Sequence, residues 1–155
     1  MTNSYIRFEE APFTLTVGSG LSLSTSTLAI SNAVCVVQGN VVADSSRVNL
    51  YGSAASLVSM NVGGSMTLTN SSTLHVFSGS TNGAAPLYGA LVSVTGALTV
   101  ATNCAIYPYS HNTNGGSVLF RAASLALAAG AMIDADGKGY AGYRPGDSYQ
   151  PGPPP

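Results

Sequence analysis

The sequence predicts an all-β protein, a right-handed parallel β-helix of about five rungs with long corner loops on one edge. One phrase recurs five times between residues 13 and 136: an apolar strand, a small or Gly-rich corner, a second alternating strand, a Ser/Thr/Asn/Gly corner and a third apolar strand. Self-similarity with a period of roughly 20 to 35 residues is typical of solenoids, whose repeats bury their apolar faces by stacking. Only 7% of the 155 residues are charged and 45% are apolar, so uncharged hydroxyl and amide groups must solvate the surface.

The strand boundaries follow from the repeat alone. The five phrases read FTLTVGSGLSLSTSTLAIS, VCVVQGNVVADSSRVNLYG, LVSMNVGGSMTLTNSSTLHVFSG, LVSVTGALTVATNCAIYPYS and VLFRAASLALAAGAMIDADG. We expect the third strands to end near Ser31, Tyr51, Phe77, Tyr109 and Asp136, and the next first strands to begin at Val34, Leu57, Leu91 and Val118.

Period-two alternation assigns an inward face to each phrase, because successive side chains of a strand point to opposite sides. The inward positions should form columns through the stack and make up the core. They are Leu21, Leu23, Leu28 and Ile30, then Val41, Ala43, Val48 and Leu50, then Met66, Leu68, Leu74 and Val76, then Leu98, Val100 and Ile106, then Leu125, Leu127 and Ile133.

The chain divides into three parts. Residues 1–12 are expected to form an N-terminal cap or arm, residues 13–136 the β-solenoid, and residues 137–155 a Gly/Pro/Tyr-rich tail that ends in PGPPP. The connections after the third and fourth phrases are the long ones, SGSTNGAAPLYGA and HNTNGGS. Insertions at one corner of successive rungs emerge along one edge, which is where such proteins place their binding loops.

This repeat resembles the parallel β-helix of pectate-lyase-like proteins and bacterial surface adhesins, over about residues 13–136. The stretch IDADGKGYAGYRPGD is also similar to the Gly-rich ends of rungs in large bacterial surface proteins. The resemblance implies a secreted or cell-surface origin, and it is compatible with the chain being a segment of something longer.

The distribution of carboxylates argues against the polysaccharide-cleaving activity that a resemblance to pectate-lyase-like proteins would imply. Cleaving a polysaccharide on a β-helix needs two or three carboxylates on adjacent rungs, for calcium or for acid and base chemistry. Of the six acids, Glu9 and Glu10 precede the first rung and Asp44 falls in the second, so a carboxylate cluster on the rungs is conceivable only around Asp134 and Asp136, in DADGKG. They are weak metal-site candidates, because an EF-hand loop needs further acids that are missing here, and an Asp-Gly turn explains them as well. The sequence therefore predicts no enzymatic activity and no cofactor.

The candidate binding or assembly surface is a set of aromatic side chains. In the aligned repeat, Tyr51, Phe77 and Tyr109 form one outward file, and His75, Tyr107 and Asp134 belong to the file beside it. An exposed row of aromatic side chains needs a partner, which here is a sugar ring, another subunit or the chain's own loops. The loop residues placed with this surface are Tyr88, Tyr140 and Tyr143. His75, Tyr107 and Asp134 also have the chemistry of a base, a donor and an orienting group, although ordinary surface roles account for them equally well.

Composition restricts the partners. The five basic residues are scattered, so nucleic acid is not an expected partner, and no apolar run is long enough to cross a bilayer. Cys35 and Cys104 fall at different points of the repeat and are not expected to form a disulfide. The sequence predicts a structural β-solenoid of the cell surface or extracellular space that assembles end to end into a filament. The alternatives are an adhesion or carbohydrate-binding module, a polysaccharide lyase or hydrolase, and a phage fibre segment.

Overall fold

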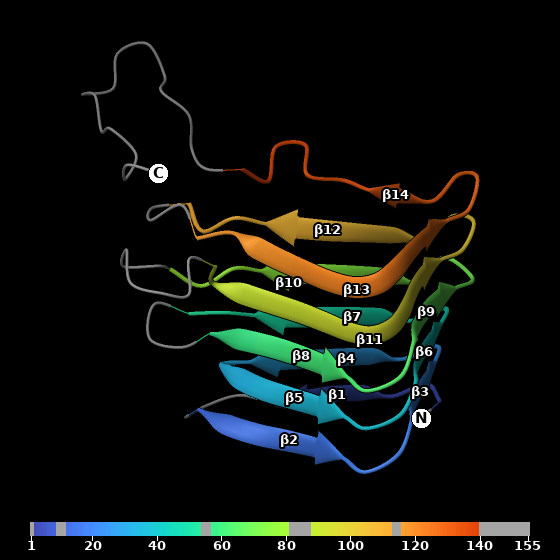
Figure 1. The fold of residues 1–155 in the computed structure, drawn as a ribbon, viewed down its shortest axis with the longest axis horizontal. Helices are drawn as coiled ribbons and strands as arrows, with labels where there is room; N and C mark the ends of the chain where they lie inside the picture. The colour runs from blue at the N-terminus through green and yellow to red at the C-terminus, as the bar shows by residue number, and fades with distance from the viewer. Residues whose placement is uncertain (1, 9–11, 54–56, 81–87, 113–115, 140–155) are drawn as a thin grey trace.

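A computed structural model describes residues 2–8, 12–53, 57–80, 88–112 and 116–139, and these residues form strands and turns without any helix (Figure 1). Most strands are short, whereas β11 and β13 each span two strand positions of the repeat. The strands are β1 Tyr5–Phe8, β2 Phe13–Val17, β3 Leu21–Ser24, β4 Thr27–Ser31, β5 Ala33–Val37, β6 Val41–Asp44, β7 Arg47–Tyr51, β8 Val58–Val62, β9 Met66–Thr69, β10 Thr73–Phe77, β11 Ala90–Val100, β12 Ala105–Tyr109, β13 Val118–Leu127 and β14 Met132–Ile133.

The strands pair in parallel in two sheets. One sheet has the order β1-β4-β7-β10-β12-β14, and the other runs β2-β5-β8-β11-β9-β6-β3, with β13 paired to β11. The long β11 joins the two arms of the second sheet, because its first half pairs with β8 and its second half with β9. Each of the five phrases thus contributes strands to both sheets, and the prediction of an all-β, parallel architecture is confirmed.

Equivalent residues of successive phrases lie opposite one another, as the repeat predicts. Strands β4, β7, β10 and β12 end at the expected residues, whereas β14 ends at Ile133 instead of Asp136. The inward columns of the first four phrases are buried, with Leu50, Met66 and Leu74 completely so. The fifth phrase differs, since its inward side chains are exposed at the end of the stack.

The N-terminal segment contains a strand that the repeat does not predict. Residues 5–8 form β1, which pairs in parallel with β4 and extends the six-stranded sheet. Ile6 and Phe8 pack against the core from this strand. The phrase structure begins only at residue 13, so periodicity carries no signal for β1.

A buried serine ladder holds the corner that leads into strands β4, β7 and β10. The Ser26 amide donates to Ser46 Oγ at 3.0 Å, and the Ser46 amide donates to Ser72 Oγ at 3.0 Å. The Ser72 hydroxyl in turn donates to the carbonyl oxygens of Thr69 at 2.6 Å and Ala43 at 2.9 Å. The ladder therefore satisfies backbone groups that the turn removes from the sheet.

The residue before each ladder serine has a left-handed backbone. The φ angles are 49° at Thr25, 49° at Ser45 and 61° at Ser71. Glycine and asparagine adopt this region most readily, and its conformational energy is highest for a β-branched residue such as threonine. The same corner carries Asn3, Asn103 and Gly130 in the other layers.

Both cysteine thiols are free, as expected from their different places in the repeat, and both are buried. Burial raises the pKa of the Cys35 thiol to about 11, so this cysteine is a protonated core side chain at neutral pH. Cys104 directly precedes β12, the position that Ser72 occupies before β10.

Candidate functional site

The aromatic file of Tyr51, Phe77 and Tyr109 forms a continuous stack, which we call the aromatic ladder. Its ring centroids are 4.8 Å apart between Tyr51 and Phe77 and 4.2 Å apart between Phe77 and Tyr109, with interplanar angles of 11° and 10°. The register of β7, β10 and β12 produces this spacing, because the three residues are paired across adjacent strands. The ladder is thus a direct product of the repeat.

The neighbouring file joins the same cluster. The His75 ring stacks on Tyr107 with centroids 4.6 Å apart, and His75 Nδ1 lies 3.3 Å from the Tyr109 hydroxyl. The residues in register with His75 on the two preceding strands are Asn49 on β7 and Ala29 on β4. They are buried, at 8% and 2% exposure, so they take no part in an exposed surface.

Lys138 closes the C-terminal side of the cluster. Its Nζ lies 5.1 Å from the ring centroid of Tyr107 and 5.7 Å from that of Tyr109, and it pairs with Asp134 Oδ2 at 2.9 Å. A cation over an aromatic face is attracted by the negative charge of the ring face. The segment after β14 therefore covers part of the ladder.

The stacking geometry limits what the ladder can bind. Sugars bind aromatic side chains through the ring face, and here the faces of Tyr51, Phe77 and Tyr109 are used by one another. Tyr51, at the end of the stack, is the most open at 36% exposure. The ladder presents mainly ring edges to solvent, which suits a structural role better than a sugar platform.

The loop tyrosines do not complete a described site. Tyr88 is half-buried at the start of the segment that leads into β11. Tyr140 and Tyr143 lie outside the described residues, and so do residues 81–87 and 113–115 of the two long insertions.

Asp134 and Asp136 form a turn. Asp134 Oδ1 accepts the Asp136 amide at 2.9 Å and Oδ2 accepts Lys138 Nζ, which leads to a lowered pKa for Asp134. Gly137 has a φ of 64° and the Lys138 amide donates to the Ala135 carbonyl, so this is the expected Asp-Gly turn. Among the described residues no three His, Cys, Asp or Glu side chains gather around a common point.

His75 is held in its neutral form. Burial, Arg47 and Lys138 together lower its pKa from 6.5 to about 4, and its Nε2 is buried without a hydrogen-bond partner among the described residues.

The lowered pKa of His75 predicts a pH-dependent stability. Between about pH 4 and pH 6.5 the unfolded chain binds more protons than the folded chain, so the free energy of unfolding should fall as the pH decreases from about 6.5 to about 4. Urea unfolding at a series of pH values tests this. His75→Phe should flatten the profile in that window, and an unchanged slope would contradict the assignment.

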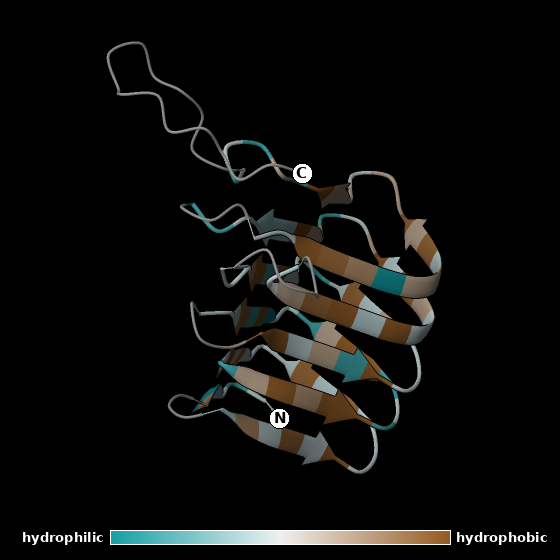
Figure 2. Cartoon of the chain, turned by 60° about the vertical axis from the view of Figure 1, so that its left-hand side comes forward, coloured by the Kyte–Doolittle hydropathy of each residue, from teal (hydrophilic) through white to brown (hydrophobic). Residues whose placement is uncertain are grey.

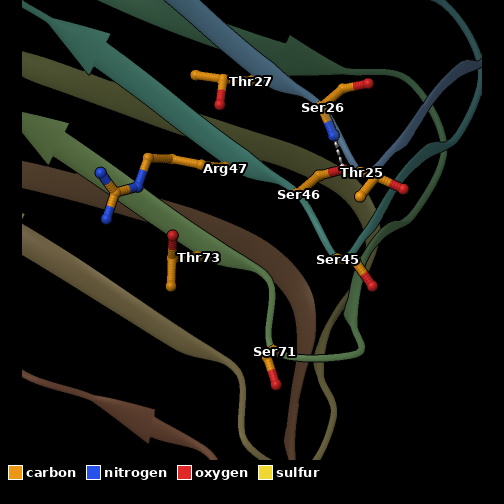
Figure 3. A pocket seen from close by; sticks show the side chains of 8 residues that line it. All are labelled: Thr25, Ser26, Thr27, Ser45, Ser46, Arg47, Ser71 and Thr73. Atoms are coloured by element: carbon orange, nitrogen blue, oxygen red, sulfur yellow. Dashed lines mark hydrogen bonds between the residues drawn. The ribbon is translucent and has the colours of Figure 1, made fainter. Parts of the chain in front are cut away.

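A second cluster is a shallow hydroxyl-lined groove of about 290 Å³ at the left-handed corner (Figure 3). Arg47 lies between Thr27 and Thr73, which are its register partners on β4 and β10. The other lining residues are Thr25, Ser26, Ser45, Ser46 and Ser71. In the sequence Arg47 is one of five scattered basic residues. The groove could have been found from the repeat, because Thr27, Arg47 and Thr73 all occupy the first position of a third strand and therefore lie side by side.

The C-terminal end of the stack is an open apolar surface. Leu125, Leu127, Met132 and Ile133 are exposed by 51%, 47%, 49% and 42%, whereas their partners Leu98, Val100, Ala105 and Ile106 in the preceding layer are exposed by 5% or less. Figure 2 shows the largely apolar colouring of β13 at this end. We call these four residues the open end.

Comparison with protein-family models, curated proteins and solved structures finds no match to this chain. In the part of the chain that the structure describes, no helix is long and apolar enough to span a membrane.

Proposed function

We propose that this chain is a structural building block of the cell surface or extracellular space, a right-handed parallel β-helix of about five rungs whose copies associate end to end. The observation that carries the proposal is the open end, where Leu125, Leu127 and Ile133 of the core columns face solvent beside the exposed Met132. A second copy, or further rungs of a longer protein, would continue these columns.

Two features of the described residues support a β-helix. Successive phrases place their strands beside the equivalent strands of the previous phrase, and the left-handed corner recurs in every layer. Crossover connections between parallel strands of one sheet are right-handed in nearly all known cases, which is the basis for the proposed hand.

Association at the open end has a clear energetic basis. Covering a half-exposed Leu, Ile or Met side chain contributes about 1 kcal/mol, and the open end offers four of them. The outer edges of β13 and β14 also have no strand partner among the described residues. The low charge of the surface leaves little repulsion between identical copies. The contact joins different surfaces of two copies, so it does not close and it propagates as a filament.

The N-terminal strand limits this association. Strand β1 extends the six-stranded sheet one strand beyond β2 and β3, so stacking through β1 leaves β13 two strand spacings, about 9.6 Å, from β2 and β3, which is too far for the strands to pair. We propose that β1 leaves β4 when two copies join, which makes it a brake on association.

The test compares a charged open end with a matched control. Leu125→Glu with Leu127→Glu places two carboxylates on the apolar surface, whereas Thr67→Glu with Thr99→Glu adds the same charge to outward positions within the stack. Sedimentation velocity should show concentration-dependent association for the wild type and the control, but monomers for the open-end variant. A chain that lacks residues 1–8 should associate at lower concentration. Equal association of the open-end variant and the wild type would contradict the proposal.

The proposal assigns no catalytic residue, cofactor or nucleic acid. Two of the three described carboxylates are engaged in local contacts: Asp44 accepts the side-chain amide of Asn70 at 2.7 Å, and Asp134 pairs with Lys138. The second candidate function is an adhesion or carbohydrate-binding module. The observation that favours it is the groove around Arg47, because the ladder offers few free ring faces.

A further inference from the structure

The groove around Arg47 combines an unpaired cation with a regular array of hydroxyl groups. Arg47 is exposed, and within the described ranges its guanidinium has no carboxylate partner. The nearest acid in sequence, Asp44, is held instead by Asn70 and by the Ser45 hydroxyl at 3.2 Å. An arginine in this state can donate two parallel hydrogen bonds to a carboxylate or sulfate.

Hydroxyl groups surround this guanidinium at the spacing of the strands. Thr27 and Thr73 lie on either side of Arg47 in the sheet, and Figure 3 shows Thr25, Ser45 and Ser71 along the corner beside them. From Thr27 to Thr73 is two strand spacings, roughly 10 Å, which is about the length of two linked sugar rings. The array therefore suits a ligand with one anionic group and several hydroxyls.

The backbone of the groove is rigid. The buried ladder serines Ser26, Ser46 and Ser72 lie directly behind the corner and fix it through the hydrogen bonds described above. The hydroxyls are thus presented in a fixed arrangement, so ligand binding costs little ordering of the protein.

The corner also stores strain where it lines the groove. Thr25, Ser45 and Ser71 have positive φ angles, whereas the corner in the remaining layers has Asn3, Asn103 and Gly130, which fit this conformation better. Strained residues persist where function outweighs the cost to stability. The three hydroxyl-bearing members are those that line the groove.

We propose that this groove binds an acidic carbohydrate, with Arg47 on a carboxylate or sulfate group and the threonine and serine hydroxyls on the sugar hydroxyls. The site is separate from the open end and lies on the side of the stack. Binding therefore does not depend on end-to-end association, and either proposal can fail alone.

Isothermal titration of the whole chain tests the site with four probes: trigalacturonate, a heparin-derived tetrasaccharide, cellotriose and inorganic sulfate. One of the two acidic oligosaccharides is expected to bind, and which one binds distinguishes a uronate from a sulfate ester. Arg47→Gln should weaken that binding by at least about tenfold, because a charge-assisted pair is lost. Thr27→Val with Thr73→Val should weaken it by about threefold or more, because the sugar hydroxyls lose partners.

The matched control is Arg121→Gln, which removes an exposed arginine of β13 and should change the affinity by less than about twofold. An equal loss in the Arg121 and Arg47 variants would mean nonspecific charge attraction and would overturn the proposal. Equal affinity for cellotriose, equal affinity for sulfate alone, or no binding of either acidic oligosaccharide would also overturn it.

Discussion

Replacing Gly89 by alanine is expected to destabilise the fold by at least about 3 kcal/mol, a large part of the stability of a small domain. A Cβ at Gly89 would overlap the Gly79 carbonyl oxygen and the Ser78 hydroxyl. Gly89 cannot move away without losing its own bonds, since its amide donates to the Ser117 carbonyl at 2.9 Å and its carbonyl accepts the Gly79 amide at 3.0 Å. Urea unfolding followed by circular dichroism measures the loss.

Gly18→Ala is the matched control for this substitution. It lies in the corner between β2 and β3, where an added Cβ meets no atom within 4 Å. The two substitutions change the intrinsic backbone preference alike, so the difference between them reports the packing of the Gly89 corner. Equal stability of the two variants would contradict the close approach of Gly79 and Gly89.

Substitution in the serine ladder is expected to cause the second large loss of stability. Ser72→Ala removes the acceptor of the Ser46 amide and should cost about 2 kcal/mol, because a buried N–H is left unsatisfied. Ser72→Cys should be milder, since Cys104 already occupies the corresponding place before β12. The neighbouring exposed substitution Ser71→Ala should change stability by less than about 0.5 kcal/mol.

Thermal and urea unfolding of these three variants separate the ladder from a general effect of losing a hydroxyl. If Ser72→Ala and Ser71→Ala were equally stable, the ladder would contribute nothing beyond the backbone hydrogen bonds of the corner.

The sequence predicts the stacked layers well because the repeat length and the alternation of apolar residues determine where the strands lie and which side chains face inward. The alternation of Leu21 and Leu23, repeated at Val41 and Ala43, identifies the core columns, and the same alignment places Tyr51 opposite Phe77. Side-chain period and repeat length are local properties, so they can be read without a structure.

Other features depend on information that the repeat does not contain. Strand β1 has no repeat partner before it, and its role follows only from its pairing with β4. The position of Lys138 over Tyr107 depends on the path of a turn, and the covered ring faces of the ladder depend on rotamers. The serine ladder could have been predicted from the aligned repeat, because Ser26, Ser46 and Ser72 each directly precede a third strand.

The measurement that tests end-to-end association most directly is sedimentation velocity of the unmodified chain over a wide concentration range, with electron microscopy of the same samples. The proposal predicts that the average mass rises steadily with concentration and that the particles are unbranched rods of uniform width. A chain that stays monomeric at the highest concentration, or that forms a closed dimer and grows no further, would contradict association through the open end.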